Sequence, residues 1–463
     1  MALPVTAPQL TRTTKLAYGF GDVTGAVIAG VYGFYMQAFL LDVAGLAPWA
    51  AGLIFAVAQF WDAVTDPIMG RISDATRSRW GRRRPFLLFG AIPLGLAFFL
   101  HWLVPPIGPE MLFFYYLVVA VLMRTAFTLV SIPYTALTPD LAPDHDGRTN
   151  LNLYRFTFSI LGGLVAVIAH PLIVGAFGDV YFGTLVSAGI WCAVIVVSTL
   201  TCFAFTRENP VHHDRAETPL TLGRRLQIVS HNTPYLIATG LFLLSWVALQ
   251  FIQANLLLYA RYWLDAEADF TKYVAVLQVT AAACLILWTR ASARIGKRMT
   301  YVAGISFWIV ALVLLWFVQP GQQAWIYGIA FLAGIGLSAA YLIPWSMLPD
   351  TIEYNEVKTG ERQEGLFYGF FVFLQKLGLS VGLGFSGWAL GAAGYLTPTV
   401  EGGELQLVSQ PDSVLTALRL FVSLVPAAVL LFSIPLALAY PITRHKHDEM
   451  CAELAARRAA STI

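Results

Sequence analysis

Charged residues are scarce in this 463-residue sequence, where Asp, Glu, Lys and Arg together make up 12%. A soluble globular domain usually carries about 25% charged residues, so the composition excludes an ordinary soluble protein. Hydrophobic residues instead reach 57%, which predicts a polytopic, all-α membrane protein embedded in a lipid bilayer. The net charge of +2 gives no indication of nucleic-acid binding.

Cysteines and enzyme motifs are also few. The four cysteines show no paired spacing, so neither a disulfide framework nor a metal site is indicated, and we expect no cofactor. The absence of a nucleophile elbow, a metal-ligand cluster and a nucleotide motif argues against a membrane enzyme. No loop is large enough for the signalling domain that a sensor without transport would need. Residues 1–15 lack a signal-peptide pattern, so we expect the first helix to act as an uncleaved insertion signal.

Apolar runs bounded by Pro, Gly and charged residues predict twelve transmembrane helices of the ~20 residues that a bilayer requires. They lie near residues 16–42, 49–72, 84–104, 111–137, 149–177, 181–206, 234–263, 270–292, 298–318, 324–346, 365–392 and 414–441. Lys and Arg cluster at the N-terminus, in every even-numbered loop and at the C-terminus. The positive-inside rule then places both termini in the cytoplasm, and we expect a bacterial inner (plasma) membrane.

A central cytoplasmic loop over residues 207–233 divides the chain into two halves of six helices, residues 1–206 and residues 234–463 with a cytoplasmic tail. The halves repeat weakly. Ile132–Leu137 followed by Pro-Asp resembles Ile343–Leu348 followed by Pro-Asp, and Arg79–Arg83 resembles Arg294–Arg298. Two such repeats at equivalent points predict tandem six-helix bundles, a transporter architecture with the substrate between the halves.

The most informative feature is a pair of acids inside the second predicted helix. Asp62 and Asp66 are four residues apart, so both carboxylates project from one helical face. A carboxylate in the hydrocarbon region costs about 2.5–3.5 kcal/mol on insertion scales, and two on one face also repel. The pair therefore predicts a proton or cation site in the N-terminal half, with an internal structural ion pair as the alternative.

Polar residues also line one stripe of the fourth helix, where Arg124, Thr128, Ser131 and Thr135 recur at helical spacing. We expect this stripe to face a cavity and to bind substrate or ion, although small polar residues also allow helices to pack closely. Arg124 needs an acidic partner, and Asp62 or Asp66 is the nearest by topology. A permanent pair would replace a metal cation, which would favour protons or no coupling.

Three further charged residues and one tryptophan complete the predicted substrate site. Asp22 lies early in the first helix, Arg155 in the cytoplasmic part of the fifth, and Trp345 at the end of the tenth. Lys376 lies near the middle of the eleventh helix, which contains no acid close to it. We expect Lys376 to pair with Asp62 or Asp66 across the halves, or to bind substrate.

Acids crowd the cytoplasmic stretch from Pro349 to Gly365, which we expect to be a loop. Such acids need basic partners, and arginines of the N-terminal half lie on the same side. A closed inner gate held by these pairs would open when the halves rock apart; the alternative is a solvated loop. The predicted gate residues are Arg77, Arg148, Asp350, Glu353, Glu356 and Arg362.

These motifs together resemble a known family. Residues 61–70 (WDAVTDPIMG), residues 75–82 (ATRSRWGR), the 349–365 stretch and Lys376 are similar to the pattern of the glycoside-pentoside-hexuronide:cation symporters, the melibiose permease-like group of the major facilitator superfamily. The resemblance covers essentially the whole chain. It implies the major facilitator fold and cation-coupled uptake by alternating access.

The resemblance also implies roles for individual residues. Asp62 and Asp66 match the cation-site carboxylates, Thr128 matches a hydroxyl ligand of that site, and Thr65 stands where the family has an asparagine near the cation. Lys376 matches a lysine linked to both ligands, and a sugar-side arginine corresponds to residue 155. The sequence departs from the pattern at the positions of two sugar-binding aspartates, a tryptophan and a small residue, which here are Ala26, Ser131, Thr135 and Arg124.

From these observations we predict a monomeric symporter that imports a sugar or glycoside with a proton or sodium ion. Ion binding at Asp62 and Asp66 would complete the substrate site and then permit closure. The alternative is a transporter of lysolipids or other amphiphiles on the same fold, since animal members of the family move lysophospholipids.

Overall fold

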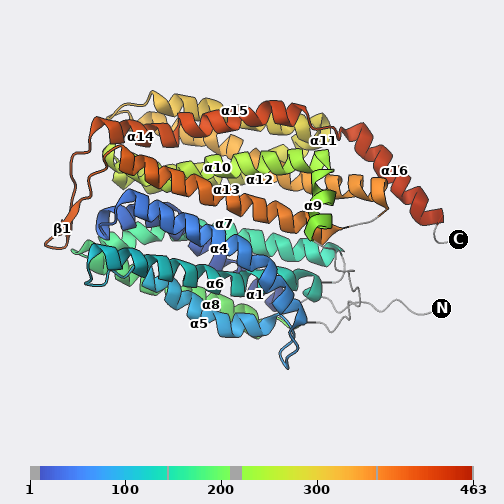
Figure 1. Cartoon of the computed structure of the whole chain (residues 1–463), viewed down its shortest axis with the longest axis horizontal. Helices are drawn as coiled ribbons and strands as arrows, with labels where there is room; N and C mark the ends of the chain where they lie inside the picture. The colour runs from blue at the N-terminus through green and yellow to red at the C-terminus, as the bar shows by residue number, and fades with distance from the viewer. Residues whose placement is uncertain (1–10, 143–144, 209–221, 361–362, 461–463) are drawn as a thin grey trace. The chain divides into compact units, whose positions relative to one another are not determined.

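The computed structural model describes residues 11–142, 145–208, 222–360 and 363–460 (Figure 1). These residues are helical except for connecting segments and one short antiparallel hairpin, β1 (Thr399–Glu401) and β2 (Glu404–Gln406). The chain divides into two compact units. Unit 1 comprises residues 1–215 and 387–410, and unit 2 comprises residues 216–386 and 411–463.

Unit 1 begins with a long helix whose hydrogen bonding changes along its length. It consists of α1 (Arg12–Gly21), α2 (Val23–Val27), the π-helical η1 (Ile28–Tyr32), α3 (Gly33–Ala38) and the π-helical η2 (Phe39–Val43). The remaining helices are α4 (Pro48–Ala75), α5 (Arg84–Leu100), α6 (Pro109–Leu141), α7 (His145–Gly175) and α8 (Val180–Phe205). Both α4 and α6 start with proline, whose fixed φ suits the first helical turn.

Unit 2 contains the second set of helices. They are α9 (Leu222–Ser230), α10 (Thr233–Tyr262), the short η3 (Glu267–Asp269), α11 (Phe270–Trp316), α12 (Gln323–Thr359), most of α13 (Glu364–Ala392), α14 (Asp412–Val422), α15 (Leu424–Leu438) and α16 (Arg444–Ala460). Apolar side chains of α10, α11, α12 and α15 form its main core.

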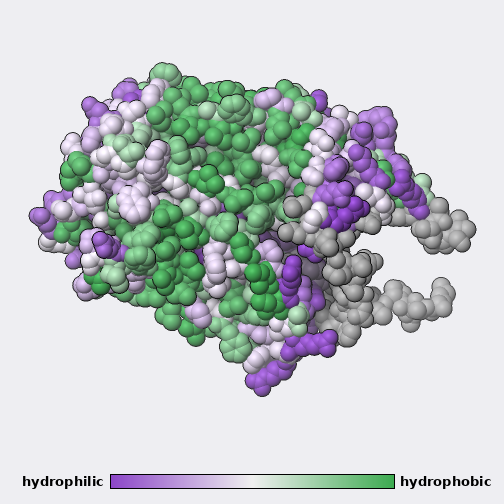
Figure 2. Space-filling model, viewed as in Figure 1, coloured by the Kyte–Doolittle hydropathy of each residue, from purple (hydrophilic) through white to green (hydrophobic). Residues whose placement is uncertain are grey.

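Nine helical segments of the described chain are long and apolar enough to cross a membrane. One of them contains α11, where Gly296, with φ of 79°, breaks the helix into two. The shorter apolar α5 and the less apolar α4, which carries the acid pair, supply two more. The described helices thus accommodate the twelve predicted spans. Figure 2 shows hydrophobic residues over much of the visible face of each unit.

The structure corrects several predicted boundaries. Residues 349–359 are not a loop, because α12 continues through Pro349 and ends at Thr359. Gly360 caps the helix with a left-handed φ of 75°, and its N–H donates to the Glu356 carbonyl. The 207–233 loop contains α9, and the tail contains α16. Residues 387–410, which we assigned to the second half, belong to unit 1.

The two repeated motifs have matching structures in their own units. In unit 1, Arg82 Nη2 donates to Asp140 Oδ1 of α6 at 3.0 Å. In unit 2, Lys297 Nζ lies 2.7 Å from both carboxylate oxygens of Asp350 in α12. Gly81 precedes Arg82 with φ of 102°, and the glycine before Lys297 turns the chain in a similar way. In each unit, a basic residue that follows a glycine with positive φ is therefore bonded to an acid in the C-terminal part of a long helix, which is α6 in unit 1 and α12 in unit 2.

Candidate functional site

The acid pair of α4 meets the polar stripe of α6. The Thr128 hydroxyl donates to Asp62 Oδ1 at 2.7 Å and lies 3.0 Å from Asp66 Oδ1. Asp62 is 1% exposed and Thr128 is buried, whereas Asp66 is partly exposed. A hydroxyl has one hydrogen, so it cannot fully satisfy both carboxylates at once. This geometry places one hydroxyl against two carboxylates, which are groups that can bind a proton or a cation.

Arg124 lies one turn before Thr128 on α6 and approaches the same pair. Its Nη1 is 3.7 Å from Asp62 Oδ2, which is longer than the 2.7–2.9 Å of a strong charge-assisted hydrogen bond. Its guanidinium lies 5.7 Å from the ring centre of Tyr32, and its buried Nε has no hydrogen-bond partner within the described ranges. The structure thus brings Arg124 to Asp62, one of its two expected partners, without a tight contact.

Thr65 lies between the two acids in sequence but its hydroxyl points elsewhere. The hydroxyl donates to the backbone carbonyls of Trp61 at 3.0 Å and Asp62 at 3.3 Å. Such back-bonding is common for threonine inside helices. The structure therefore does not direct the Thr65 hydroxyl hydrogen toward the carboxylate pair.

Asp22 and Arg155, two predicted substrate-binding residues, form an ion pair between the end of α1 and α7. Arg155 Nε is 3.3 Å from Asp22 Oδ1. A neighbouring network supports this region, since the Tyr18 hydroxyl lies 2.5 Å from the Thr138 hydroxyl and the Tyr134 hydroxyl donates to the Tyr18 carbonyl at 2.7 Å. The pair offers hydrogen-bond donors and acceptors at one place without net charge.

The other predicted residues of α6 are hydroxyls at different depths. Ser131 is half-buried, and Thr135 is exposed. The Thr135 hydroxyl donates to the Ile132 carbonyl at 3.0 Å, while its oxygen can still accept a hydrogen bond.

Two predicted substrate residues belong to unit 2. Trp345 of α12 packs edge-to-face on Phe242 and Phe371, with ring centres 5.3 Å apart in both cases, and remains 40% exposed. Lys376 of α13 is half-buried. Its pairing with Asp62 or Asp66, which would join the two units, stays a prediction.

The gate acids of α12 have partners inside unit 2, whereas we expected arginines of the first half. Asp350, 5% exposed, is bound by Lys297, and its Oδ1 lies 3.6 Å from His447 Nε2. Glu353 Oε2 lies 3.3 Å from the same nitrogen. The α11 turn and α16 place these basic groups beside α12, which the loop prediction did not foresee.

The remaining gate residues are Arg77, Arg148, Glu356 and Arg362. Arg77 is exposed, and Arg148 Nε donates to the Ala142 carbonyl at 2.9 Å. Glu356 is half-buried. Arg362 lies outside the described residues. A gate between the halves therefore stays a prediction.

Sequence reasoning missed Glu208, which follows α8. Its carboxylate accepts hydrogen bonds from the backbone N–H groups of Arg82, Arg83 and Arg84, at 2.8, 2.8 and 2.9 Å. These N–H groups stand at the start of α5, where a helix favours negative charge. No local sequence signal links Glu208 to a loop more than 120 residues earlier; the basic run only suggested topology.

Comparisons with known proteins agree on one family. The family model for MFS/sugar transport proteins matches residues 17–444. A protein of Synechocystis described as an uncharacterised symporter is 34% identical, over 99% of both chains. A sodium-dependent lysophosphatidylcholine symporter of Danio rerio is 29% identical, over 95% of this chain and 87% of its own.

A third relative and a solved structure complete the comparison. YagG of Escherichia coli, which has the provisional name of a glycoside/cation symporter, is 28% identical, over 98% of this chain and 96% of its own. The crystal structure of the nucleoside transporter NupG superimposes with a TM-score of 0.64 and 14% identity, over 93% of this chain and 100% of its own. At that identity the structural likeness bears on the fold alone.

Proposed function

The chain belongs to the family of MFS/sugar transport proteins, and on this premise we propose that it imports a sugar or glycoside together with one proton or sodium ion. Membership confirms the expected major facilitator fold, and the chain is a multi-pass membrane transporter rather than an enzyme. The coupling ion, the substrate, the inner-membrane location and the cytoplasmic termini are parts of the proposal.

The observation that carries the proposal is the contact of one hydroxyl with two carboxylates. Asp62 and Asp66 are bridged by Thr128 inside unit 1, with Arg124 at 3.7 Å from Asp62. Arg124 brings one positive charge to Asp62, and we propose that a coupling proton or cation binds to the same carboxylate pair.

We propose that the acid pair couples ion and substrate. Because burial of charge is costly, an ion bound at the pair would favour a closed state. In this proposal, ion binding at Asp66 and Thr128 shifts the population toward closure. Substrate then binds to a site that is complete only when the ion is present.

The residues that we propose for substrate binding suit a polyhydroxylated substrate. Asp22 and Arg155 supply an acceptor and a donor within one ion pair, and the α6 stripe supplies the hydroxyls of Ser131 and Thr135. In unit 2, Trp345 offers a partly exposed aromatic face and Lys376 a further donor. This set supports a sugar or glycoside as the substrate, and the YagG relative points the same way.

The test starts with thermal unfolding of the purified protein against sugars and glycosides, with and without sodium and across pH. A ligand that binds the folded state raises apparent stability by mass action. The sugar that stabilises the protein is then used in proteoliposomes with Asp62→Asn, which should abolish concentrative uptake but leave exchange in part intact. Asp74→Asn is the matched control, because Asp74 lies on α4 but is exposed and contacts Arg83 at 3.1 Å. Normal accumulation by Asp62→Asn would contradict the proposal.

An amphiphile such as a lysolipid is the second candidate substrate. The observation that favours it is a mostly apolar pocket in unit 2, lined by α10, α11 and α12 side chains such as Leu256, Leu277 and Leu312. The Danio rerio relative is named for lysophosphatidylcholine. Stabilisation by lysophosphatidylcholine below its critical micelle concentration, together with no stabilisation by any sugar, would favour this candidate over the first.

A further inference from the structure

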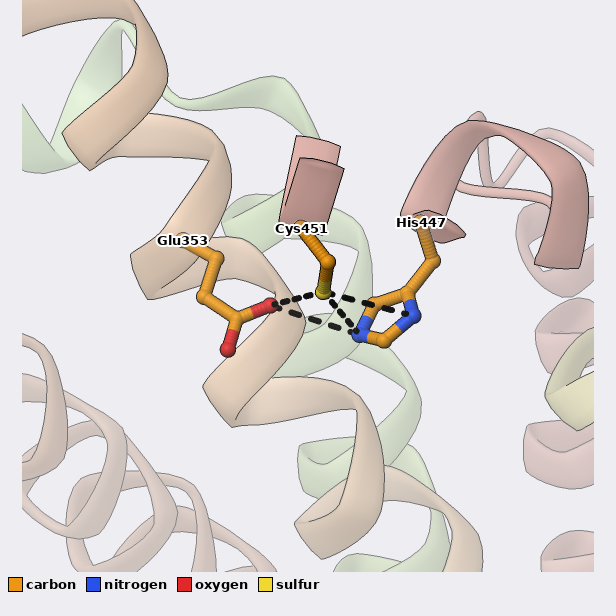
Figure 3. Close-up of side chains that lie close together, drawn as sticks. All are labelled: Glu353, His447 and Cys451. Atoms are coloured by element: carbon orange, nitrogen blue, oxygen red, sulfur yellow. Dashed lines mark hydrogen bonds and ion pairs between the residues drawn. The ribbon is translucent and has the colours of Figure 1, made fainter. Parts of the chain in front are cut away.

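Three potential metal ligands converge at one end of unit 2, apart from the transport site. Figure 3 shows Glu353 of α12 pointing toward His447 and Cys451 of α16. Glu353 Oε2 lies 3.3 Å from His447 Nε2 and 3.7 Å from Cys451 Sγ, and Sγ lies 3.7 Å from His447 Nε2. Each of these three atoms, Oε2, Nε2 and Sγ, is therefore in contact with the other two.

These separations match the edges of a coordination tetrahedron. Zinc bonds of about 2.0–2.3 Å to oxygen, nitrogen and sulfur, at tetrahedral angles, place neighbouring ligand atoms about 3.3–3.6 Å apart. The three observed distances are equal to or slightly longer than this range, so an ion fits between the ligands with little movement. His447 and Cys451 are four residues apart on one helix, which puts them on the same face.

The packing of α16 holds the ligands in register. Met450 and Leu454, which flank Cys451 along the helix, are buried, and Met450 belongs to the main apolar core of unit 2. Further along α16, Arg457 Nη1 donates to the Val357 carbonyl of α12 at 2.9 Å. The helix that carries two ligands is thus fixed against the helix that carries the third.

The charges around the cluster also suit a divalent cation. A thiolate and a carboxylate together balance two positive charges, and the imidazole is a neutral ligand. Asp350, 3.6 Å from His447 Nε2, adds negative potential, but Lys297 binds both of its oxygens.

We propose that Glu353, His447 and Cys451 bind a zinc ion that fastens α16 to α12. A mixed sulfur, nitrogen and oxygen ligand set favours zinc over magnesium or calcium, which prefer oxygen ligands. The proposal revises the expectation that the cysteines form no metal site. It is independent of the substrate and of the coupling ion.

The test uses full-length protein purified in chelator, with zinc and cobalt as probes. We expect one tightly bound zinc ion per chain, and a cobalt form with the visible bands of tetrahedral Co²⁺ and a near-ultraviolet band from thiolate coordination. Cys451→Ser should remove the thiolate band, and His447→Gln or Glu353→Gln should weaken zinc binding at least tenfold. Cys192→Ser and His445→Gln, which alter a thiol and an imidazole outside the cluster, should bind zinc as the wild type does.

A second readout separates metal binding from misfolding. Cys451 is exposed, so a maleimide should modify it in metal-free protein, and zinc should slow this reaction reversibly. In His447→Gln the same zinc concentration should give no protection, while the circular dichroism and the metal-free melting temperature stay as in the wild type. Equal protection in wild type and His447→Gln, or an unchanged cobalt spectrum in Cys451→Ser, would overturn the proposal.

Discussion

Replacement of Thr128 by valine removes the hydroxyl that contacts both acids while nearly keeping the side-chain shape. A hydrogen bond to a charged group contributes about 1.5–3 kcal/mol. The two contacts, 2.7 and 3.0 Å, share one hydrogen, so one such bond is lost rather than two. In the proposed coupling scheme this bond is lost from the ion-free site, and the loss raises the free energy of that site.

Since 1.4 kcal/mol corresponds to a factor of ten, the apparent ion affinity should change by about 10- to 100-fold. A proton needs no oxygen ligand, so in a proton-coupled transporter Thr128→Val should half-saturate at a correspondingly lower proton concentration. A sodium ion would lose a ligand oxygen at the same time. In a sodium-coupled transporter, the increase in apparent ion affinity should therefore be cancelled or reversed.

The assay is uptake by reconstituted protein of the sugar identified by thermal unfolding, first across pH without sodium and then across sodium at fixed pH. Thr125→Val is the matched control, since its hydroxyl accepts from Trp61 Nε1 at 2.9 Å and is not bonded to the acid pair. The control should keep the wild-type ion dependence. If Thr128→Val also kept the wild-type dependence on both ions, the bridge would have no part in coupling.

Two further predictions concern unit 2. Gly336→Ala should destabilise the protein by about 1–3 kcal/mol or more, because a Cβ there would lie 2.4 Å from Trp308 Cβ and 2.6 Å from its backbone nitrogen; Gly328→Ala on the same helix meets no atom within 4 Å and should be neutral or stabilising in the same thermal-unfolding assay. The pKa of the Cys451 thiol is raised above its ordinary value, mainly by partial desolvation and secondly by the Glu353 carboxylate. Maleimide modification of metal-free protein should therefore be slow at neutral pH, and its rate should still increase above pH about 8.5. Glu353→Gln should speed it at neutral pH, and a rate that levels off below that pH would contradict the assignment.

The parts of the site that could be predicted from sequence depend on helical periodicity. Asp62 and Asp66 share a face because they are four residues apart, and the α6 stripe places Arg124 and Thr128 on a face of its own. The structure brings the two faces together. Helical spacing was less informative for Thr65, because it gives the position of the side chain but not the direction of its hydroxyl, which donates to the Trp61 carbonyl.

Contacts between distant segments could not be predicted from the same patterns. Glu208 reaches the start of α5 across more than 120 residues, and the Tyr395 hydroxyl bonds to Asp42 of η2, although neither acid belongs to a motif. The helical course of residues 349–359 was missed because this acid-rich stretch was expected to be a loop, whereas α12 continues through Pro349. The spacing of His447 and Cys451 was a usable signal, but only α12 reveals the third ligand.

Each unit closes its own salt bridges: Arg82 with Asp140 in one, and Lys297 with Asp350 in the other. Neither contact reaches outside the bundle that makes it, so neither has to break when the transporter changes the side to which it opens. Each bundle can then rotate as a rigid body. The energy barrier of the cycle must lie in contacts other than these, and mutations that cut them should soften a bundle rather than bias the direction in which it faces.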